Sequence, residues 1–262
     1  MAENMLEVDD IRLSFGGLKA IDGCSFEVER GTITALIGPN GAGKSTTVNT
    51  IAGAYRPQSG KIRFNGEDIT NLPTYARAQK GLIRTYQISR EFGGMSVLEN
   101  LLVVRRGQSG ERLINAVFRG RQSKRETEAL VAEANEILNT FGIYKLRHEF
   151  ASNLSGGQKR LLELSRAVMA QPKMMLLDEP MAGVTPALIE RLGSHMVELN
   201  RSMGMTFVLV EHNLEIVEKI CSQVVVMALG KKLAEGTMAE LRSKPEVIEA
   251  YLGGGAHERV GG

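Results

Sequence analysis

Residues 38–45 carry the clearest chemical signal in the chain. They read Gly-Pro-Asn-Gly-Ala-Gly-Lys-Ser, which fits the pattern G-x-x-x-x-G-K-[ST] of loops that cradle phosphates. An apolar, β-rich run at 32–37 precedes them and a helix-compatible stretch follows, as that pattern requires. An accidental glycine-rich turn that ends in Lys-Ser is the alternative, and the flanking strand favours the nucleotide site.

Each part of this loop has a role in binding a nucleotide. Its glycines let backbone N–H groups turn toward the phosphates without a Cβ in the way. The helix that begins near Gly43 adds the positive end of its dipole. Lys44 supplies a mobile positive charge for the β- and γ-phosphates, and Ser45 can be a ligand of Mg²⁺. The predicted binding residues are Gly38, Pro39, Asn40, Gly41, Ala42, Gly43, Lys44, Ser45 and Thr46.

Two adjacent acids, Asp178 and Glu179, follow the apolar run 174–177. Such a run reads as a buried parallel strand, and ligands bind at the carboxyl ends of these strands in open α/β sheets. We expect Asp178 to hold Mg²⁺ through its water shell and Glu179 to accept a proton from the attacking water. Taken alone, the pair fits a solvated strand end better. Downstream of a phosphate loop, the catalytic interpretation is favoured.

A second glycine turn, Leu-Ser-Gly-Gly-Gln at 154–158, precedes a helical stretch at 161–169. Its position suits another anion site at a helix N-terminus. One nucleotide does not need two γ-phosphate cradles in one chain, so this turn is predicted to close over a nucleotide held by a second copy. Its predicted contacts across the dimer are Ser155, Gly156, Gly157 and Gln158. The alternative is an ordinary helix capped by Ser155, which leaves the double glycine unexplained.

Two polar residues complete the candidate site. His212 follows the strand-like run 206–210, at the same predicted sheet edge as Asp178, and could bond the γ-phosphate or orient water. Gln87 lies where the first sheet region gives way to a helical region and could reach Mg²⁺ or the attacking water. A structural histidine and an ordinary surface glutamine are the alternatives.

The remaining chain alternates between strand-like and helix-like stretches. Asn65-Gly66 after one strand-like run predicts a hairpin turn. Apolar residues between 130 and 141 recur on one helical face, and Gly142 supplies a stop. Later strand-like runs with helical stretches between them imply an α/β fold with parallel strands and crossover helices. The predicted strands lie at 5–8, 11–15, 24–28, 32–37, 61–64, 174–177, 206–210 and 224–227.

Composition excludes several classes of protein. The 32 basic residues nearly cancel the 30 acidic ones, so a net charge of +2 gives no electrostatic case for binding nucleic acid. The acidic first ten residues do not resemble a signal peptide. Cys24 and Cys221 read as small hydrophobes in a reducing cytosol. No apolar run approaches the roughly 18 residues of a membrane span, so a transport role requires membrane partners.

The segment 105–125 has an unusual charge, with seven basic residues against one acid, Glu111. A solvated surface is one interpretation. A face near anionic lipid head groups or near a partner is the other.

In order and spacing, these motifs resemble the ATP-binding cassettes of ABC transporters over nearly the whole chain. The resemblance implies ATP and Mg²⁺ as cofactors, with Ser45, Gln87 and Asp178 on the metal and Glu179 and His212 catalytic. Phe15 lies where that family places an aromatic ring on adenine. The implied fold is a RecA-like P-loop NTPase core with an N-terminal antiparallel β subdomain and an inserted helical subdomain. It forms one domain over 1–253, with the insertion at about 88–165 and a flexible tail at 254–262.

A finer resemblance points to the larger cassette subunit of branched-chain amino acid importers, a group that includes urea and short-chain amide importers. It rests on the stretches 13–20, 81–87, 95–102 and 247–253. It implies an ATPase that powers uptake, peripheral on the cytoplasmic face of the cell (inner) membrane. Its partners would be transmembrane permease subunits, a second cassette (homologous or identical) and, indirectly, an extracytoplasmic solute-binding protein. A urea or amide importer and a lipid or drug exporter stay open as alternatives.

Other nucleotide-binding classes fit less well. A GTPase should carry an Asn-Lys-x-Asp motif, which the chain lacks, and an SMC-type ATPase needs long arms where only 66 residues separate Gln87 from Leu154. Translation-factor cassettes usually carry two sets of motifs in one chain, and a non-catalytic scaffold should have lost Lys44 or Glu179. One departure from the cassette pattern is Thr185, at a position that most cassettes fill with an aspartate working across the dimer.

Overall fold

An antiparallel sheet near the N-terminus is ordered β2-β1-β4-β5. In the computed structural model its strands are β1 (Asn4–Phe15), β2 (Leu18–Glu29), β4 (Ser59–Phe64) and β5 (Glu67–Asp68). The two strand-like runs predicted at 5–8 and 11–15 form one strand, because a bulge at Asp10, with φ 42°, absorbs the break in the alternation. The hairpin predicted at Asn65-Gly66 is confirmed, with φ values of 52° and 77°.

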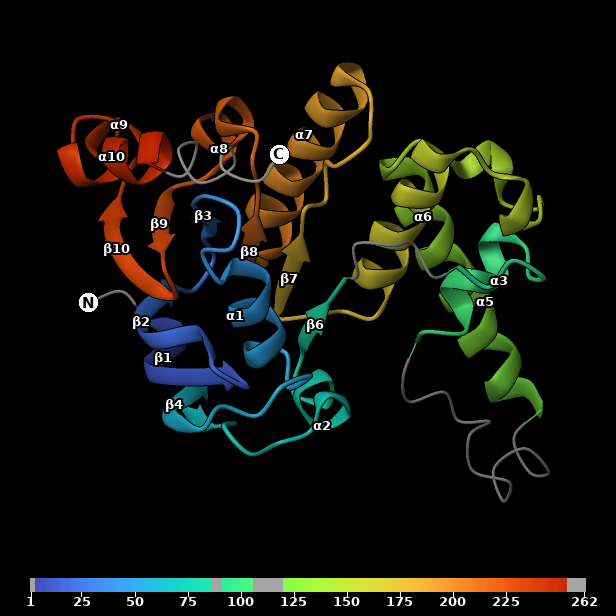
Figure 1. Cartoon of the computed structure of the whole chain (residues 1–262). Helices are drawn as coiled ribbons and strands as arrows, with labels where there is room; N and C mark the ends of the chain where they lie inside the picture. The colour runs from blue at the N-terminus through green and yellow to red at the C-terminus, as the bar shows by residue number, and fades with distance from the viewer. Residues whose placement is uncertain (1–2, 86–90, 106–119, 254–262) are drawn as a thin grey trace. The chain divides into compact units, whose positions relative to one another are not determined.

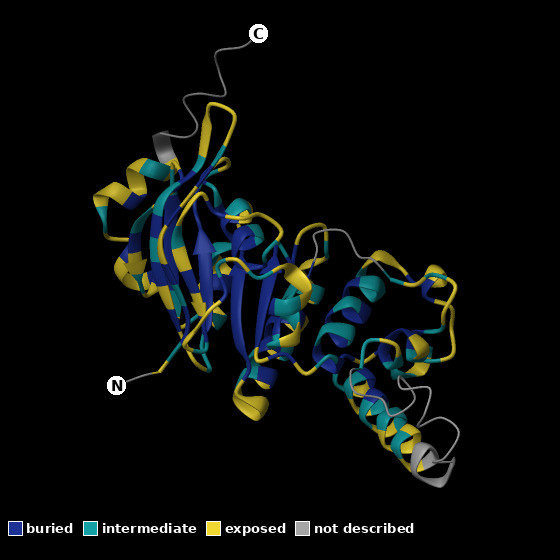
Figure 2. Ribbon diagram, turned by 90° about the horizontal axis from the view of Figure 1, so that it is seen from below, coloured by how far each residue is buried: buried dark blue, intermediate teal, exposed yellow. Residues whose placement is uncertain are grey.

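A second sheet of six strands is ordered β10-β9-β3-β8-β7-β6 (Figure 1). Neighbours from β9 to β6 pair in parallel and β10 pairs antiparallel with β9, so the predicted parallel strands are confirmed. Every residue of β3, β7 and β8 is buried, and Figure 2 shows the centre of this sheet in dark blue. The strands are β3 (Ile33–Ile37), β6 (Leu82–Arg84), β7 (Met174–Asp178), β8 (Thr206–Val210), β9 (Gln223–Ala228) and β10 (Lys231–Gly236).

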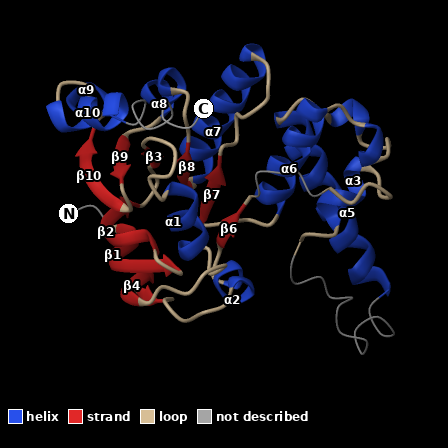
Figure 3. Cartoon of the chain, in the orientation of Figure 1, coloured by secondary structure: helices blue, strands red, loops and turns tan. Residues whose placement is uncertain are grey.

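Helices alternate with these strands (Figure 3). Val48 and Ile51 of the first helix pack into one hydrophobic core with residues of both sheets. Asn213 is the N-cap of α8 (Leu214–Ile220), and its side chain accepts hydrogen bonds from the N–H groups of Glu215 and Ile216. This helix therefore begins just after His212. The helices are α1 (Lys44–Ile51), α2 (Thr74–Gln79), α7 (Pro186–Met203), α8 (Leu214–Ile220), α9 (Met238–Leu241) and α10 (Pro245–Gly253).

Between β6 and β7, the described part of the chain consists of helices joined by turns and loops. It holds α3 (Val97–Leu102), α5 (Gly120–Thr140) and α6 (Gly156–Met169). Leu138 and Phe141 are buried, and Gly142 ends the helix with φ 66°, so the predicted amphipathic helix and its stop are confirmed. Of the basic segment, Arg105 pairs with Glu133 at 3.6 Å, and 106–119 lie outside the described residues.

The structure describes residues 3–85, 91–105 and 120–253. They fall into two units, one of Met1–Gln87, Lys173–Gly183 and Ile189–Gly262, the other of Ile88–Pro172 and Val184–Leu188. Gln87 and the expected tail at 254–262 lie outside the described residues. No helix among the described residues is long and apolar enough to cross a membrane.

Candidate ATP-binding and catalytic site

One hollow of the first unit, about 370 Å³ in volume, gathers most of the residues that the sequence analysis selected. It lies where the turn between β1 and β2, the phosphate loop and the residues after β7 and β8 meet. The carboxyl ends of parallel strands share one edge of a sheet, which is why segments distant in sequence converge here. The lining residues are Phe15, Leu18, Lys19, Ala20, Asn40, Gly41, Ala42, Gly43, Lys44, Ser45, Thr46, Glu179 and His212.

The candidate phosphate loop, residues 38–45, depends on a glycine at its junction with α1. Gly43 is the N-cap of that helix with φ 96°, and a Cβ built there would lie 2.4 Å from the carbonyl oxygen of Ala20. Any other residue would meet both a strained backbone and a clash. The first residues of α1, from Lys44 to Thr46, line the hollow. The N–H groups at the start of a helix favour an anion there.

Lys44 is buried in the loop rather than extended into solvent. Its Nζ donates to the carbonyl oxygens of Gly38, at 2.9 Å, and Pro39, at 3.0 Å. Burial lowers the pKa of the Lys44 ammonium, while the nearby carboxylates of Glu179 and Asp178 act in the opposite direction. The ammonium is thus held inside the loop that would surround a phosphate.

Ser45 and Asp178 lie in direct contact although 133 positions separate them. The Ser45 hydroxyl donates to Asp178 Oδ1 at 3.0 Å, and Arg84 donates to Asp178 Oδ2 at 3.0 Å. A hydroxyl and a carboxylate beside a phosphate site are the hard oxygen ligands that Mg²⁺ prefers, so this pair fits the ion. The sequence analysis did not single out Arg84, whose partner lies on a neighbouring strand.

Glu179 and His212 also meet, with Nε2 of the histidine 3.1 Å from Oε1 of the glutamate. The strands β7 and β8 that precede them are neighbours, and the Glu179 N–H donates to the Val210 carbonyl at 3.0 Å. Glu179 adopts φ 49°, a left-handed conformation that is uncommon for residues other than glycine. Such backbone strain persists where the surroundings enforce it, often at functional sites.

Glu211 is a buried acid that the sequence analysis missed. It accepts bonds from the N–H groups of Met181, at 3.0 Å, and His212, at 3.1 Å. Burial raises the pKa of its carboxyl group, and these bonds act against that shift. Glu211 thereby ties the segment after Glu179 to the backbone of His212. Its position in the sequence, between the apolar run 206–210 and His212, was the signal that could have identified it.

Phe15 stands at the rim of the hollow with 47% of its surface exposed. Its ring meets that of Tyr55 edge to face, with centroids 5.2 Å apart and an interplanar angle of 75°. The edge contact fixes the ring of Phe15. An exposed, held aromatic ring beside a phosphate loop suits a flat base, and Tyr55 is a support that the sequence analysis did not identify.

In the second unit, Ser155 caps α6. It forms a capping box with Gln158, whose side chain accepts from the Ser155 N–H at 2.9 Å. The capped helix considered as the alternative is therefore present, and part of the double glycine has a local reason. A Cβ at Gly157 would lie 2.8 Å from a methyl carbon of Leu188, whereas one at Gly156 would meet nothing within 4 Å. Gly156 keeps a bare surface that packing does not explain.

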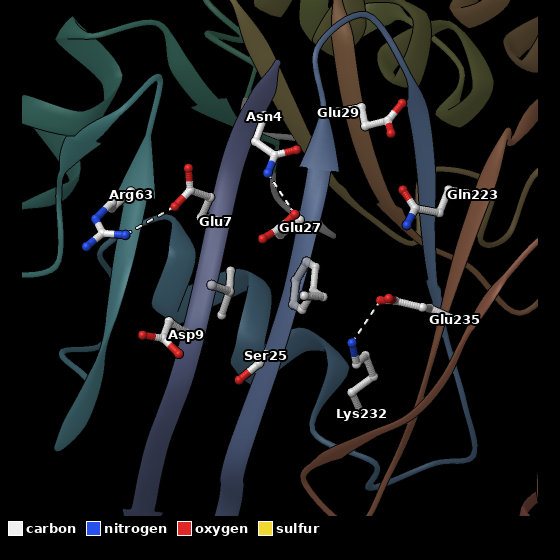
Figure 4. A pocket seen from close by; sticks show the side chains of 12 residues that line it. Asn4, Glu7, Asp9, Ser25, Glu27, Glu29, Arg63, Gln223, Lys232 and Glu235 are labelled. Carbon is white, nitrogen blue, oxygen red and sulfur yellow. Dashed lines mark hydrogen bonds and ion pairs between the residues drawn. The ribbon is translucent and has the colours of Figure 1, made fainter. Parts of the chain in front are cut away.

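A second hollow of the first unit, about 510 Å³, has a different chemistry (Figure 4). Side chains of β1, β2, β4, β9 and β10 line it. Arg63 pairs with Glu7, and Lys232 with Glu235. The lining residues include the five acids Glu7, Asp9, Glu27, Glu29 and Glu235, against these two bases. This surplus of carboxylates repels phosphates, so the second hollow does not suit a nucleotide.

The chain is similar to known proteins over most of its length. The profile of the ABC transporter family matches residues 21–182, and a profile described as branched-chain amino acid ATP-binding cassette transporter matches residues 231–257. The probable branched-chain amino acid transport ATP-binding protein LivG of Archaeoglobus fulgidus is 43% identical over 249 residues, 95% of each chain. The high-affinity branched-chain amino acid transport ATP-binding protein BraF of Pseudomonas aeruginosa is 36% identical, and the match covers 97% of this chain and 99% of that relative.

Solved structures of cassettes share the fold as well. A nucleotide-free ATP-binding cassette from an ABC transporter superposes with a TM-score of 0.80 at 38% identity, covering 95% of this chain and 99% of that one. Another cassette, in its ADP conformation, gives 0.80 at 37% identity, covering 96% and 99%. The chain therefore belongs to the ABC transporter family, as an ATP-binding cassette that hydrolyses ATP and works with transmembrane permease components. The resemblance found in the sequence and the fold class that it implied are confirmed.

Proposed function

We propose that this cassette powers the import of branched-chain amino acids. The observation that carries the proposal is similarity over 95% or more of the chain to relatives named for that transport, extended by a matching profile at 231–257. No observation on the chain favours a urea or amide importer or an exporter over this one. The motor would act at the cytoplasmic face of the cell membrane, as a peripheral subunit.

The site residues divide the work of hydrolysis. The phosphate loop and Lys44 bind the phosphates, and Phe15 stacks on adenine. Ser45 and Asp178, together with Gln87, hold Mg²⁺, which neutralises phosphate charge when it is bound. Glu179 accepts the proton of the attacking water, and its 3.1 Å contact with His212 supports a shared role because the histidine orients the carboxylate.

The assembly that we propose contains two cassettes, each closing over the nucleotide of the other. Gly156, bare at the start of α6, and its neighbours Ser155, Gly157 and Gln158 would cap the γ-phosphate bound by the second copy or a homologous subunit. In each chain, residues 1–253 act as one domain, with 88–165 as its helical insertion. Permease subunits and an extracytoplasmic solute-binding protein complete the importer.

Replacing Ser155 by arginine should abolish ATP-dependent association of cassettes. The long cationic side chain would fill the space meant for the partner's nucleotide, while the phosphate loop of the same chain is unaltered. We expect light scattering of the Glu179→Gln protein with ATP to show a dimer, or a heterodimer once a homologous cassette is added. The Ser155→Arg, Glu179→Gln protein should stay monomeric and still bind ATP.

Ser96 offers a matched control, because it forms the same kind of capping box with Glu99 at the start of α3. Ser96→Arg removes a helix cap of equal type, worth about 1 kcal/mol, and should leave association unchanged. An equal loss of association in the Ser155→Arg and Ser96→Arg variants would count against the two-cassette assembly. So would a Glu179→Gln protein that shows no ATP-dependent association, either alone or with a homologous cassette.

Deletion of the gene should abolish high-affinity uptake of labelled leucine, isoleucine or valine by cells. Restoring the wild-type chain should return uptake, and the Lys44→Ala chain should not, because a motor with impaired ATP binding and hydrolysis cannot drive transport. Loss of urea or amide uptake with normal leucine uptake would show that the protein powers an importer of a different substrate. Normal uptake of all these solutes, with loss of lipid or drug export, would overturn the importer itself.

A further inference from the structure

The carboxylate of Glu211 joins the two segments that follow β7 and β8. This side chain lies in the interior, with only 4% of the residue exposed. Its Oε1 accepts from the N–H of Met181 at 3.0 Å, and its Oε2 accepts from the N–H of His212 at 3.1 Å. Met181 stands two positions after Glu179 in the chain. One buried carboxylate therefore bridges the segments that carry Glu179 and His212.

The surroundings of this carboxylate suit its ionised form. Burial raises the pKa of the Glu211 carboxyl group, while the backbone N–H groups that face it, including that of Asn213, act in the opposite direction. Each oxygen meets at least one of these donors. An amide in the same place would turn its own NH₂ group toward one of them. Glutamine therefore cannot keep both of the bonds that glutamate makes.

The backbone of Glu179 is held by hydrogen bonds on both of its sides. Its N–H donates to the Val210 carbonyl at 3.0 Å, and its carbonyl accepts from the N–H of Ala182 at 3.1 Å. The residue keeps a φ of 49°, which costs energy unless neighbouring contacts enforce it. Met181 lies inside the turn that Ala182 closes, and its N–H is the one that Glu211 accepts. Glu211 thus anchors the turn that holds Glu179 in this conformation.

We propose that Glu211 is a positioning residue that fixes the mutual geometry of Glu179 and His212. In that geometry Nε2 of the histidine lies 3.1 Å from Oε1 of the glutamate. Glu211 is not among the residues that line the hollow, so it acts through the two segments and not on the nucleotide. A displacement of about 1 Å at a reacting group can cost about 10²-fold in rate. The inference rests on the assignment of Glu179 as general base made above.

The test is the turnover of the Glu211→Gln transporter. Glutamine keeps the volume of the side chain and one acceptor oxygen, but it leaves one backbone N–H without its partner. One of the two segments is then released. We expect kcat to fall about tenfold, less than for removal of the base itself, with ATP affinity unchanged. Phosphate release at saturating ATP measures kcat, and titration with a fluorescent ATP analogue measures affinity.

Combining this change with Glu179→Gln distinguishes positioning from general damage. Residues that act as a unit in catalysis show losses that do not multiply. Once the base is gone, Glu211 has no carboxylate left to position, so Glu211→Gln should change the residual turnover of the Glu179→Gln transporter little. Damage that is only structural would lower turnover by the same factor in both backgrounds.

Thr206 provides the matched control, because it is fully buried at the opposite end of β8. Its hydroxyl accepts from the N–H of Gly31 at 2.9 Å, so it too ties a strand end to the backbone of another segment. Thr206→Val should lower the unfolding temperature and leave turnover near the wild-type value. Glu211→Asp keeps two acceptor oxygens on a side chain one methylene shorter, so its loss should be in the same direction and smaller.

The outcomes separate the two assignments. If the Glu179→Gln transporter keeps near-normal turnover, the base assignment fails and this inference fails with it. If Glu179→Gln is slow but the folded Glu211→Gln protein turns over ATP as fast as Thr206→Val, the base assignment stands and Glu211 has no positioning role. Losses that multiply in the double variant lead to the same conclusion. If Glu211→Gln does not fold, Glu211→Asp in the same combination with Glu179→Gln decides.

Discussion

Glu179→Gln should lower the turnover of ATP by about 10²-fold or more and leave ATP binding intact, because the amide cannot accept the proton of the attacking water. The substitution keeps the size of the side chain and an oxygen able to accept from His212, now 3.1 Å from Glu179 Oε1. Phosphate release by the assembled transporter measures turnover, and titration with a fluorescent ATP analogue measures binding. The loss should appear in kcat with little change in KM.

Glu215 provides the control for this experiment. It is an exposed acid in the first turn of α8, three positions after His212 and outside the residues that line the hollow. Glu215→Gln removes the same charge from the neighbourhood and should keep turnover close to the wild-type value. A Glu179→Gln transporter of near-normal turnover would show that another group takes the proton.

Lys44→Ala should weaken ATP binding roughly ten- to hundredfold, because hydrogen bonds to a charged partner contribute about 1.5–3 kcal/mol. The ammonium lies buried inside the loop, on the carbonyl oxygens of Gly38 and Pro39, and need move only locally to meet a phosphate. Hydrolysis should fall by more than binding, since charge on the phosphates shifts in the transition state. Calorimetric titration with ATP and the rate of phosphate release give the two quantities.

Lys19 is the matched lysine for that measurement, since it lines the same hollow but is mostly exposed. Lys19→Ala should change ATP affinity only slightly, because a solvated charge contributes little. Equal losses in the two variants would indicate a diffuse electrostatic effect of the hollow. If the Lys44→Ala protein bound ATP with unchanged affinity, residues 38–45 would not be the loop that binds the phosphates.

Much of the site could be predicted because its elements have strong local signals. The run before Asp178 is apolar throughout and the run before Gly38 is apolar except for Thr34, as expected for strands buried on both faces, and both strands are fully buried. Predicting parallel strands was enough to place Asp178 and His212 at one edge. The contact between Glu179 and His212 follows from the pairing of β7 with β8.

Other parts of the fold were beyond local patterns. The strand β6 has only three residues, too few to show a period, and its neighbour β7 lies about ninety positions further along the chain. The pairing of Arg84 with Asp178 depends on that neighbour relation. The bulge at Asp10 similarly joined two strand-like runs that looked separate, because the conformation of one residue restored the alternation.

The sequence by itself determined which residues form the candidate phosphate loop, which acids end a buried strand and which family the chain belongs to, because these depend on residue types at short spacing. Tertiary structure decided which side chains meet: Arg84 with Asp178, Glu211 with the backbone of Met181, Phe15 with Tyr55. The physical reason is the order of the strands, β10-β9-β3-β8-β7-β6, which is not the order of the chain. Contacts across such a sheet arise only when the core has packed it into that order.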